Sequence, residues 1–178
     1  MADTGSATAR ETAADHPQLV VVCGPPGVGK TTVSEGVADR IDGELLRTDV
    51  VREDVAPDPE YTDAERKRVY DELFARGRKA VRRGENAVLD GTFQYRPVRE
   101  RAQSLADELG AEFRSVKVEC AEPVVRERIA GRTDDESDAD FEVHAMIREQ
   151  FDPLSVDHVT VDNSETLAET QRQLDRLF

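Results

Sequence analysis

The fold is decided by the apolar run Leu19-Val20-Val21-Val22-Cys23 and by the segment that follows it directly, Gly24-Pro25-Pro26-Gly27-Val28-Gly29-Lys30-Thr31. The apolar run is short, continuous and rich in β-branched residues, which predicts a strand buried on both faces, as in a parallel sheet. The glycines and prolines end that strand, and apolar side chains at helical spacing follow over residues 31–41. The sequence therefore predicts a strand, a tight loop and a helix in direct succession.

The tight loop fits the pattern Gly-x-x-x-x-Gly-Lys-Ser/Thr without deviation, and it has the strand before it and the helix after it that the pattern requires. In such a loop the backbone N–H groups and the helix N-terminus face phosphate oxygens. We expect Lys30 to reach the β- and γ-phosphates of ATP and to act in catalysis, and the Thr31 hydroxyl to bind Mg²⁺. The loop residues predicted to bind ATP are Gly24, Pro25, Pro26, Gly27, Val28, Gly29, Lys30, Thr31 and Thr32.

Strands and helices alternate along the rest of the chain. The predicted strands are 19–23, 44–47, 87–90, 113–120 and 158–161, and the predicted helices are 31–41, 62–83, 97–109, 122–132, 139–151 and 164–177. This order predicts an α/β three-layer sandwich with a five-stranded, mainly parallel sheet. Ligands of such sheets bind at the carboxyl ends of the strands, so the residues just after each strand are the candidates for chemistry.

Asp49 and Arg52 follow the second predicted strand. A carboxylate there can accept the proton of a hydroxyl that attacks the γ-phosphate, and an arginine one helical turn later can hold an anionic part of the acceptor. Asp49 is therefore the candidate general base, and both residues are candidates for binding the acceptor. The alternative is that Asp49 simply caps a short helix that contains Arg52.

Asp90 ends the third predicted strand and is followed by Gly91-Thr92. A carboxylate in this position can orient magnesium-bound water or Thr31, so Thr31 and Asp90 are the candidate metal ligands. Asp90 can equally cap the turn that follows it. Just beyond, Arg96 and Arg99 are candidates for binding the acceptor, or surface residues in a chain with 20 arginines.

Arg128 and Arg132 lie four residues apart, on one face of a predicted helix and before the acidic stretch 133–140. We expect that stretch to be a mobile loop within a lid over residues 129–142. The two arginines can close over the nucleotide and neutralise charge in the transition state, which makes both of them catalytic candidates. The alternative is an exposed pair bonded to nearby carboxylates.

The composition is strongly acidic, with 38 Asp and Glu residues against 24 basic ones and a formal net charge of −14. Only four of the basic residues are lysines. Such a surface stays hydrated when concentrated salt screens charge, so a salt-loving source is one interpretation and an ordinary acidic protein is the other. The charge argues against a long nucleic-acid track or an anionic membrane as partner, because both ligands are themselves negative.

No stretch has the roughly 18 apolar residues needed to span a bilayer, and the first 17 residues lack the regions of a secretory signal. We therefore expect a cytoplasmic protein. Residues 1–17 predict a flexible acidic tail, and residues 18–178 predict a single domain. The sequence gives no indication of the oligomeric state.

From about residue 19 to its end, the chain resembles the small P-loop kinases of the nucleoside-monophosphate-kinase type. The branch it resembles contains polynucleotide 5′-hydroxyl kinases, zeta-toxin-like kinases and predicted AAA-type kinases. The resemblance implies a P-loop NTPase fold with a small mobile lid. It also implies that an Asp-x-x-Arg after the second strand, here Asp49 and Arg52, supplies the general base and an arginine that binds the acceptor.

The resemblance implies further roles at the nucleotide site. In that family one lid arginine stacks on the adenine and the other reaches phosphate, and Arg128 and Arg132 match this pair. The loop after the last strand completes the adenine pocket, which points to Asn163 as an ATP-binding residue. The segment 89–93 resembles the family's segment beside magnesium and acceptor, which adds Thr92 to the candidates for binding the acceptor.

The sequence therefore predicts a phosphotransferase that uses ATP and Mg²⁺ and acts on a hydroxyl of a small molecule or of a nucleic-acid 5′ end. A nucleoside-monophosphate kinase is the nearest alternative. Its acceptor is a phosphate rather than a hydroxyl, so it needs less help from a base and more arginines. A nucleotide-binding switch or motor ATPase is a third possibility, although no Asn-Lys-x-Asp sequence for reading guanine is present.

Overall fold

The protein is described by a computed structural model that covers residues 16–132 and 137–178. Five strands form one sheet in the order β2-β3-β1-β4-β5, and all four ladders are parallel. The strands are β1 Gln18–Cys23, β2 Gly43–Arg47, β3 Asn86–Asp90, β4 Glu112–Glu119 and β5 Val159–Asp162. The helices are α1 Lys30–Ile41, α2 Thr48–Val55, α3 Asp63–Arg82, α4 Arg96–Leu109, α5 Glu122–Ala130, α6 Ser137–Glu149 and α7 Leu167–Leu177.

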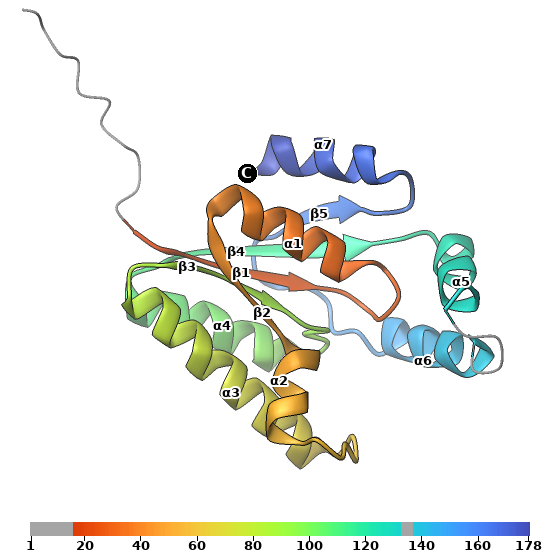
Figure 1. Ribbon diagram of the computed structural model, residues 1–178, viewed down its shortest axis with the longest axis horizontal. Helices are drawn as coiled ribbons and strands as arrows, with labels where there is room; N and C mark the ends of the chain where they lie inside the picture. The colour runs from red at the N-terminus through yellow and green to blue at the C-terminus, as the bar shows by residue number, and fades with distance from the viewer. Residues whose placement is uncertain (1–15, 133–136) are drawn as a thin grey trace, which may run out of the picture.

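The helices form layers on the two faces of the sheet, which confirms the predicted α/β fold. Helices α1 and α7 lie on one face, and α3 and α4 lie on the other (Figure 1). Helices α5 and α6 pack against each other beyond the carboxyl ends of β1 and β4, and α2 follows directly from the end of β2 (Figure 1). The carboxyl edge of the sheet is therefore surrounded by α2, α5 and α6.

Strand β1 lies in the middle of the sheet, as its continuous apolar run predicts. Leu19, Val21 and Cys23 pack into the cluster under α3 and α4, whereas Val20 and Val22 pack into the cluster under α1 and α7. All five side chains are completely buried. Burial of each aliphatic side chain contributes about 1.5–3 kcal/mol, so β1 anchors both layers and fixes the loop that follows it.

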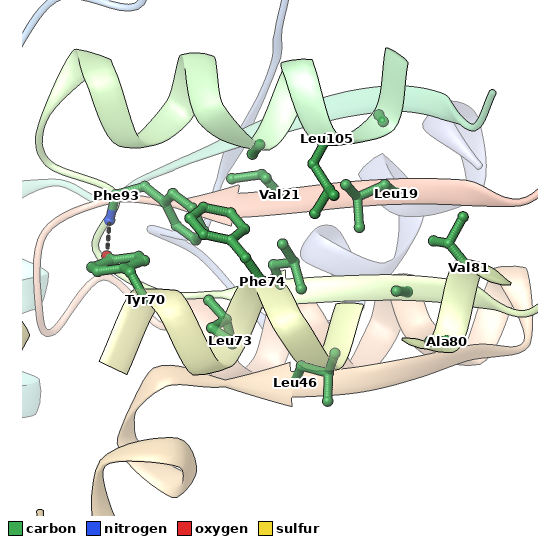
Figure 2. Close-up of a cluster of buried hydrophobic side chains, with 14 of the residues drawn as sticks. Leu19, Val21, Leu46, Tyr70, Leu73, Phe74, Ala80, Val81, Phe93 and Leu105 are labelled. Atoms are coloured by element: carbon green, nitrogen blue, oxygen red, sulfur yellow. Dashed lines mark hydrogen bonds between the residues drawn. The ribbon is translucent and has the colours of Figure 1, made fainter. Parts of the chain in front are cut away.

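The core between the sheet and α3 contains three aromatic rings close to the carboxyl edge (Figure 2). The Tyr70 ring contacts the edge of the Phe93 ring at 5.1 Å between centroids, and Phe74 packs beside both. The Tyr70 hydroxyl accepts a hydrogen bond of 2.9 Å from the backbone N–H of Phe93, drawn as a dashed line in Figure 2. This bond fixes the chain just after β3, where candidate site residues lie.

Several predicted boundaries differ from the structure, and two predicted helices end two residues early, at Ala130 in α5 and at Glu149 in α6. Helix α6 begins at Ser137, so residues 137–140 of the predicted acidic loop are helical, and residues 133–136 lie outside the described part of the chain. Helix α7 begins only at Leu167, because the Thr166 side chain caps it by accepting from the N–H of Glu169. The segment after β2 is helical from Thr48 onward.

Two predictions about the chain's ends and lid fall largely outside the described part. The expected tail covers residues 1–17, of which the structure describes only 16 and 17. The Pro17 carbonyl accepts a hydrogen bond of 2.9 Å from the N–H of Glu112, so Pro17 already takes part in the pairing between β1 and β4. The mobility expected for the lid, 129–142, stays a prediction. None of the described helices has the length and apolar character of a membrane span.

Candidate active site

The phosphate loop turns sharply from β1 into α1, and its glycines are required by geometry. Gly24 and Gly29 have φ angles of 152° and 86°, a region that side-chain-bearing residues rarely adopt. A Cβ on Gly24 would lie 2.7 Å from the carbonyl oxygen of Val118, and one on Gly29 would lie 2.1 Å from Nδ2 of Asn163. Neighbouring segments therefore hold the loop closely from behind.

A cavity of about 330 Å³ opens on the other side of the loop, at the carboxyl edge of the sheet. Its walls come from the phosphate loop, the ends of β2 and β3, the start of α2 and the end of α5. The lining residues are Pro26, Gly27, Gly29, Lys30, Thr31, Thr32, Arg47, Thr48, Asp49, Asp90, Thr92 and Arg132. This phosphate cavity brings together Lys30, Asp49 and Asp90, which the sequence analysis picked from three separate strand ends.

Lys30 lies at the start of α1 and donates a hydrogen bond of 3.1 Å from Nζ to the carbonyl oxygen of Pro25. Burial lowers the pKa of its ammonium group, and the negative charge of Asp90 partly opposes that effect. The Lys30 side chain thus reaches across the phosphate loop to its opposite end. This placement agrees with a lysine that meets the outer phosphates of a nucleotide.

Asp90 ends β3 with a buried carboxylate, and its Oδ2 has no hydrogen-bond partner among the described residues. Burial raises the pKa of this carboxyl group, and the positive charge of Lys30 opposes the shift. An unpartnered buried carboxylate oxygen in a cavity is a place for a cation.

The residues present fit a bound Mg²⁺. Arg47 lies 3.3 Å from Thr31 Oγ1 through its Nη2 and 4.0 Å from Asp90 Oδ2 through its Nε, so the hydroxyl and the carboxylate face the same part of the cavity. Hydroxyl and carboxylate oxygens are the ligands that Mg²⁺ takes, usually one or two from the protein with phosphates and water completing the shell. No group of three or more His, Cys, Asp or Glu side chains that could hold a metal ion occurs among the described residues.

Asp49 lies in the first turn of α2 at the rim of the phosphate cavity. Its Oδ1 accepts from the N–H of Val50 at 2.9 Å, and its Oδ2 accepts from Arg47 at 2.7 Å. Arg47, not Asp49, holds the N-cap position of α2, and no side chain caps this helix. The side chain of Asp49 is 63% exposed, so a ligand in the cavity can reach it.

Arg47 is a site residue that the sequence analysis missed. It ends β2 in register with Asp90 at the end of β3, so the two side chains meet at the same sheet edge. Its guanidinium contacts Thr31, Asp49 and Asp90. A signal was available, because Arg47 directly precedes Thr48-Asp49 at a predicted strand end.

A second cavity, of about 770 Å³, adjoins the first. It is lined by Thr48, Arg52, Tyr61, Arg66, Tyr70, Thr92, Gln94, Tyr95, Val98, Val143, Met146, Ile147 and Gln150. Thr48 and Thr92 line both cavities, so the two spaces meet beside Asp49. We call this space the acceptor cavity. The sequence predicts Arg52 and Thr92 as residues that bind the acceptor, and it predicts that the basic helix over residues 66–83, which includes Arg66, favours a phosphorylated or polynucleotide acceptor. The rest of the lining was not predicted, because it comes from α3, α4, α6 and loops that only the folded chain brings together.

Arg52 lines the acceptor cavity but is already paired. Its Nη1 donates to the carboxylate of Glu65, and its guanidinium lies 5.2 Å from the centre of the Tyr61 ring. Burial alone would favour the neutral acid of Glu65. However, hydrogen bonds from the backbone N–H of Glu60, from Arg52 and from the backbone N–H of Tyr61 outweigh burial and lower its pKa. Glu65 therefore stays charged and fixes the position of Arg52.

Arg96 and Arg99 are not brought to either cavity within the described chain. Arg99 is almost completely buried, and its guanidinium donates to four backbone carbonyls, those of Phe93, Gln94, Asp152 and Pro153. Its donors therefore hold together the loop after β3 and the segment after α6. Arg96 is exposed and bonds Glu100 one helical turn later. This geometry indicates that Arg99 stabilises the fold and that Arg96 is a surface residue.

The two lid arginines have different surroundings. Arg132 lines the phosphate cavity, whereas Arg128 donates from Nη2 to the carbonyl oxygen of Asn163 at 2.7 Å. The buried Asn163 donates to the Val28 carbonyl at 2.9 Å, and its Oδ1 accepts from Thr170 at 2.7 Å. Asn163 thus supports the phosphate loop from behind, and its contact with adenine stays a prediction, as do the two arginine roles.

Comparison with known protein families matches this arrangement. The model of the AAA_33 family, described as an AAA domain, matches residues 19–154. The chain belongs to this family. The match includes the phosphate loop and the strand ends that carry Asp49 and Asp90.

A curated relative of this AAA-domain chain is the uncharacterised protein Rv2004c of Mycobacterium tuberculosis, which is 28% identical over 142 residues. The match covers 73% of this chain and 28% of that protein. The chain therefore spans little more than a quarter of the curated relatives it matches.

Solved structures show the same fold. A gluconokinase from Sinorhizobium meliloti 1021 superposes with a TM-score of 0.66 at 23% identity, covering 90% of this chain and 93% of that one. The APS kinase CysC of Mycobacterium tuberculosis, solved with AMPPNP and APS, gives a TM-score of 0.71 at 16% identity, covering 91% and 97%. The AAA-domain chain thus has the fold of P-loop kinases.

Proposed function

We propose that the protein transfers the γ-phosphate of ATP to a hydroxyl group of a small acceptor, with Asp49 as general base. The observation that carries this proposal is the junction of the two cavities at Thr48 and Thr92, beside Asp49. One cavity has the groups for a triphosphate, and the other offers separate room for an acceptor. A carboxylate at their junction is where a hydroxyl proton has to be removed.

The residues divide the work of the reaction among them. The Asp49 carboxylate takes the proton of the acceptor hydroxyl as its oxygen bonds to the γ-phosphorus, and the bond from that phosphorus to the β–γ bridging oxygen breaks to leave ADP. Lys30 and Arg132 place positive charge where negative charge develops. Thr31 and Asp90 would hold Mg²⁺, which when bound neutralises phosphate charge. Arg47 hydrogen-bonds Asp49 and thereby orients its carboxylate.

The charges of the acceptor cavity favour a hydroxyl acceptor over a nucleoside monophosphate. A phosphate acceptor is normally held by unpaired arginines. Here Arg52 is paired with the buried carboxylate of Glu65, whereas Arg66 makes only an exposed ion pair of 2.9 Å with Asp63, which contributes little. With a net charge of −14 on the whole chain, a long polynucleotide is a poorer ligand than a metabolite or a single 5′ end.

The structural neighbours add support of a general kind. Two proteins of this fold are named as kinases of gluconate and of APS, and one of them was solved with the ATP analogue AMPPNP. The fold therefore accommodates both a nucleotide and a separate small acceptor. The residues that line the acceptor cavity of this chain determine which acceptor it binds, so the acceptor has to be identified by experiment.

The test is a transfer screen with γ-labelled ATP and Mg²⁺ over sugars, sugar acids, nucleosides, nucleoside monophosphates and 5′-hydroxyl oligonucleotides, at low and high salt. We expect label in one class of hydroxyl-bearing small molecules. Label only in nucleoside monophosphates would replace the proposal by the nucleoside-monophosphate kinase. ATP turnover with release of inorganic phosphate and no labelled acceptor would favour the switch or motor ATPase instead.

A further inference from the structure

His144 is a buried histidine on α6 that contacts the phosphate loop. Its side chain is 1% exposed, and its Nδ1 lies 2.7 Å from the carbonyl oxygen of Pro26. A carbonyl oxygen can only accept, so this contact requires the proton on Nδ1. The other ring nitrogen, Nε2, is buried with no hydrogen-bond partner among the described residues. Among the described residues, the hydrogen bond to Pro26 is therefore the one hydrogen bond of the His144 ring.

The peptide between Pro26 and Gly27 connects this contact to the nucleotide. In a trans peptide the C=O and the following N–H point in opposite directions. Holding the Pro26 carbonyl toward α6 thus sets the direction in which the N–H of Gly27 points. Pro26 and Gly27 both line the phosphate cavity, where loops of this pattern present N–H groups to phosphate oxygens.

Gly27 itself is enclosed from the same side of the loop. Its φ is 85°, and a Cβ placed on it would lie 3.1 Å from side-chain atoms of both Val125 and Ile129 on α5. Helix α5 therefore packs directly on Gly27, while α6 holds the residue before it. Without such contacts a glycine in this conformation would sample many others.

The position of His144 is fixed by packing between α5 and α6. The Phe141 ring lies 5.6 Å from the His144 ring, and Phe141 packs in the same buried cluster as Val125 and Ile129. Arg126 on α5 lies 3.7 Å above the Phe141 ring. The histidine is therefore held by both helices, and its donor is aimed at one loop carbonyl.

We propose that His144 is a positioning residue for ATP, which fixes the Pro26–Gly27 peptide so that the Gly27 N–H faces the phosphates. This inference rests on the proposed function, in which residues 24–32 bind the phosphates of ATP. It gives α6 a second task, since the same helix also supplies Val143 and Met146 to the wall of the acceptor cavity.

Three substitutions separate the hydrogen bond from the packing. In His144→Asn the side-chain amide places an N–H near the position of Nδ1, so the donor is kept. In His144→Gln the amide N–H lies one carbon further out, near the position of Nε2. In His144→Phe the ring and its packing on Phe141 stay, but the donor is lost. The Asn and Gln variants form a matched pair, because they carry the same chemical group.

The experiment measures the Kd of AMPPNP with Mg²⁺ by calorimetry, together with kcat and KM of the transfer reaction. Loss of the donor should weaken nucleotide binding and raise KM for ATP about ten-fold in the Phe and Gln variants, with kcat at saturating ATP and KM for the acceptor within about two-fold. The Asn variant should stay within about three-fold of the wild type. Should the Phe variant fail to fold, the Asn–Gln pair decides.

The outcomes separate the two proposals. If the wild-type chain binds AMPPNP and the Asn and Gln variants bind it equally well or equally poorly, the positioning role is refuted and the proposed function stands. If the wild-type chain itself does not bind the nucleotide, both proposals fail together.

Discussion

At the scale of the residue, Asp49 is placed by two contacts that leave it open to solvent. Its carboxylate is oriented by Arg47 and by the N–H of Val50, yet most of its side chain is exposed at the cavity junction. A general base needs this combination of fixed direction and access. Asp54, on the same helix, offers a matched control because its carboxylate instead pairs with Arg76 at 2.8 Å.

We expect Asp49→Asn to lower kcat for phosphate transfer by about 10²- to 10⁴-fold, because the acceptor hydroxyl then loses its base. KM for ATP should change little. Asp54→Asn should keep kcat within about two-fold of the wild type. Steady-state transfer with γ-labelled ATP measures both variants, and an Asp49→Asn enzyme as fast as the wild type would refute the assignment.

Tyr70 gives a prediction about stability. Its hydroxyl accepts from the N–H of Phe93, so Tyr70→Phe leaves that buried donor unpaired and should cost about 1–3 kcal/mol in the free energy of unfolding. Chemical denaturation at neutral pH measures this loss. A Tyr70→Phe protein as stable as the wild type would show that the bond contributes nothing.

The same residue predicts a dependence on pH. Burial raises the pKa of Tyr70 to about 12, from a usual value of 10.0, although the hydrogen bond from Phe93 works in the opposite direction. The folded state therefore keeps the Tyr70 proton up to a higher pH than the unfolded chain does. The buried neutral hydroxyl contributes fully to the free energy of unfolding below pH 10, and this contribution is lost as the pH rises toward 12. The phenolate absorbance should show a step near pH 12 that Tyr70→Phe removes. An unchanged titration would contradict the assignment.

Single residues also show which parts of the site could be predicted from the sequence. Lys30, Thr31, Asp49 and Asp90 could be predicted because each follows a strand that the hydrophobic pattern reveals. The surroundings of Arg52 could not, because its pairing with Glu65 depends on how α2 packs against α3. Thr62 caps α3 by accepting from the N–H of Glu65, whereas the carboxylate of Glu65 accepts from Arg52 and from the loop before α3, which no local pattern indicates.

At the scale of the element, Arg99 joins segments that are far apart in the chain. Its position on α4 lets one guanidinium hold the loop after β3 and the segment after α6. Those two segments flank the acceptor cavity, to which Gln94 and Gln150 contribute. A charge pattern alone does not distinguish such a buried arginine from its exposed neighbour Arg96.

We expect Arg99→Met to lower the free energy of unfolding by about 3 kcal/mol or more, because four carbonyls lose their donor while the aliphatic packing is partly kept. Arg96→Met should cost less than about 1 kcal/mol, since an exposed ion pair contributes little. Urea unfolding of the two variants makes the comparison. Equal decreases in the free energy of unfolding for the two variants would contradict a stabilising role of Arg99.

Element boundaries show a second limit of sequence reasoning. The strands and the longer helices were predicted within a few residues, since their apolar periodicity is strong. The start of α6 was missed because residues 133–140 carry many acidic side chains, which favour a loop by composition. Tertiary contacts, such as those of Phe141 and His144, outweigh that local preference.

At the scale of the whole molecule, the charge is distributed unevenly. The chain carries −14, yet three of the five charged residues that line the phosphate cavity are positive: Lys30, Arg47 and Arg132. An anionic nucleotide therefore meets local positive charge within an acidic surface. Lys30 and Arg132 were predicted site residues, whereas Arg47 was not, and Arg52 and Arg128 do not line this cavity.

The acidic surface predicts a response to salt. Repulsion among the excess carboxylates weakens the folded state when salt is scarce, and screening relieves it. We expect the free energy of unfolding to rise from low to multimolar KCl if the protein is adapted to salt. Denaturation in a KCl series measures this, and equal stability at both ends would leave an ordinary acidic protein as the explanation.

The central claim is that γ-phosphate passes from ATP to a hydroxyl. Phosphorus NMR of the product formed from ATP, Mg²⁺ and the acceptor found in the screen tests it most directly, because phosphate esters, diphosphates and free phosphate give separate signals. We expect a new phosphate monoester that forms in equal amount with ADP and forms far more slowly in Asp49→Asn. Conversion of the acceptor itself to a diphosphate, or formation of ADP with inorganic phosphate and no phosphorylated acceptor, would contradict it.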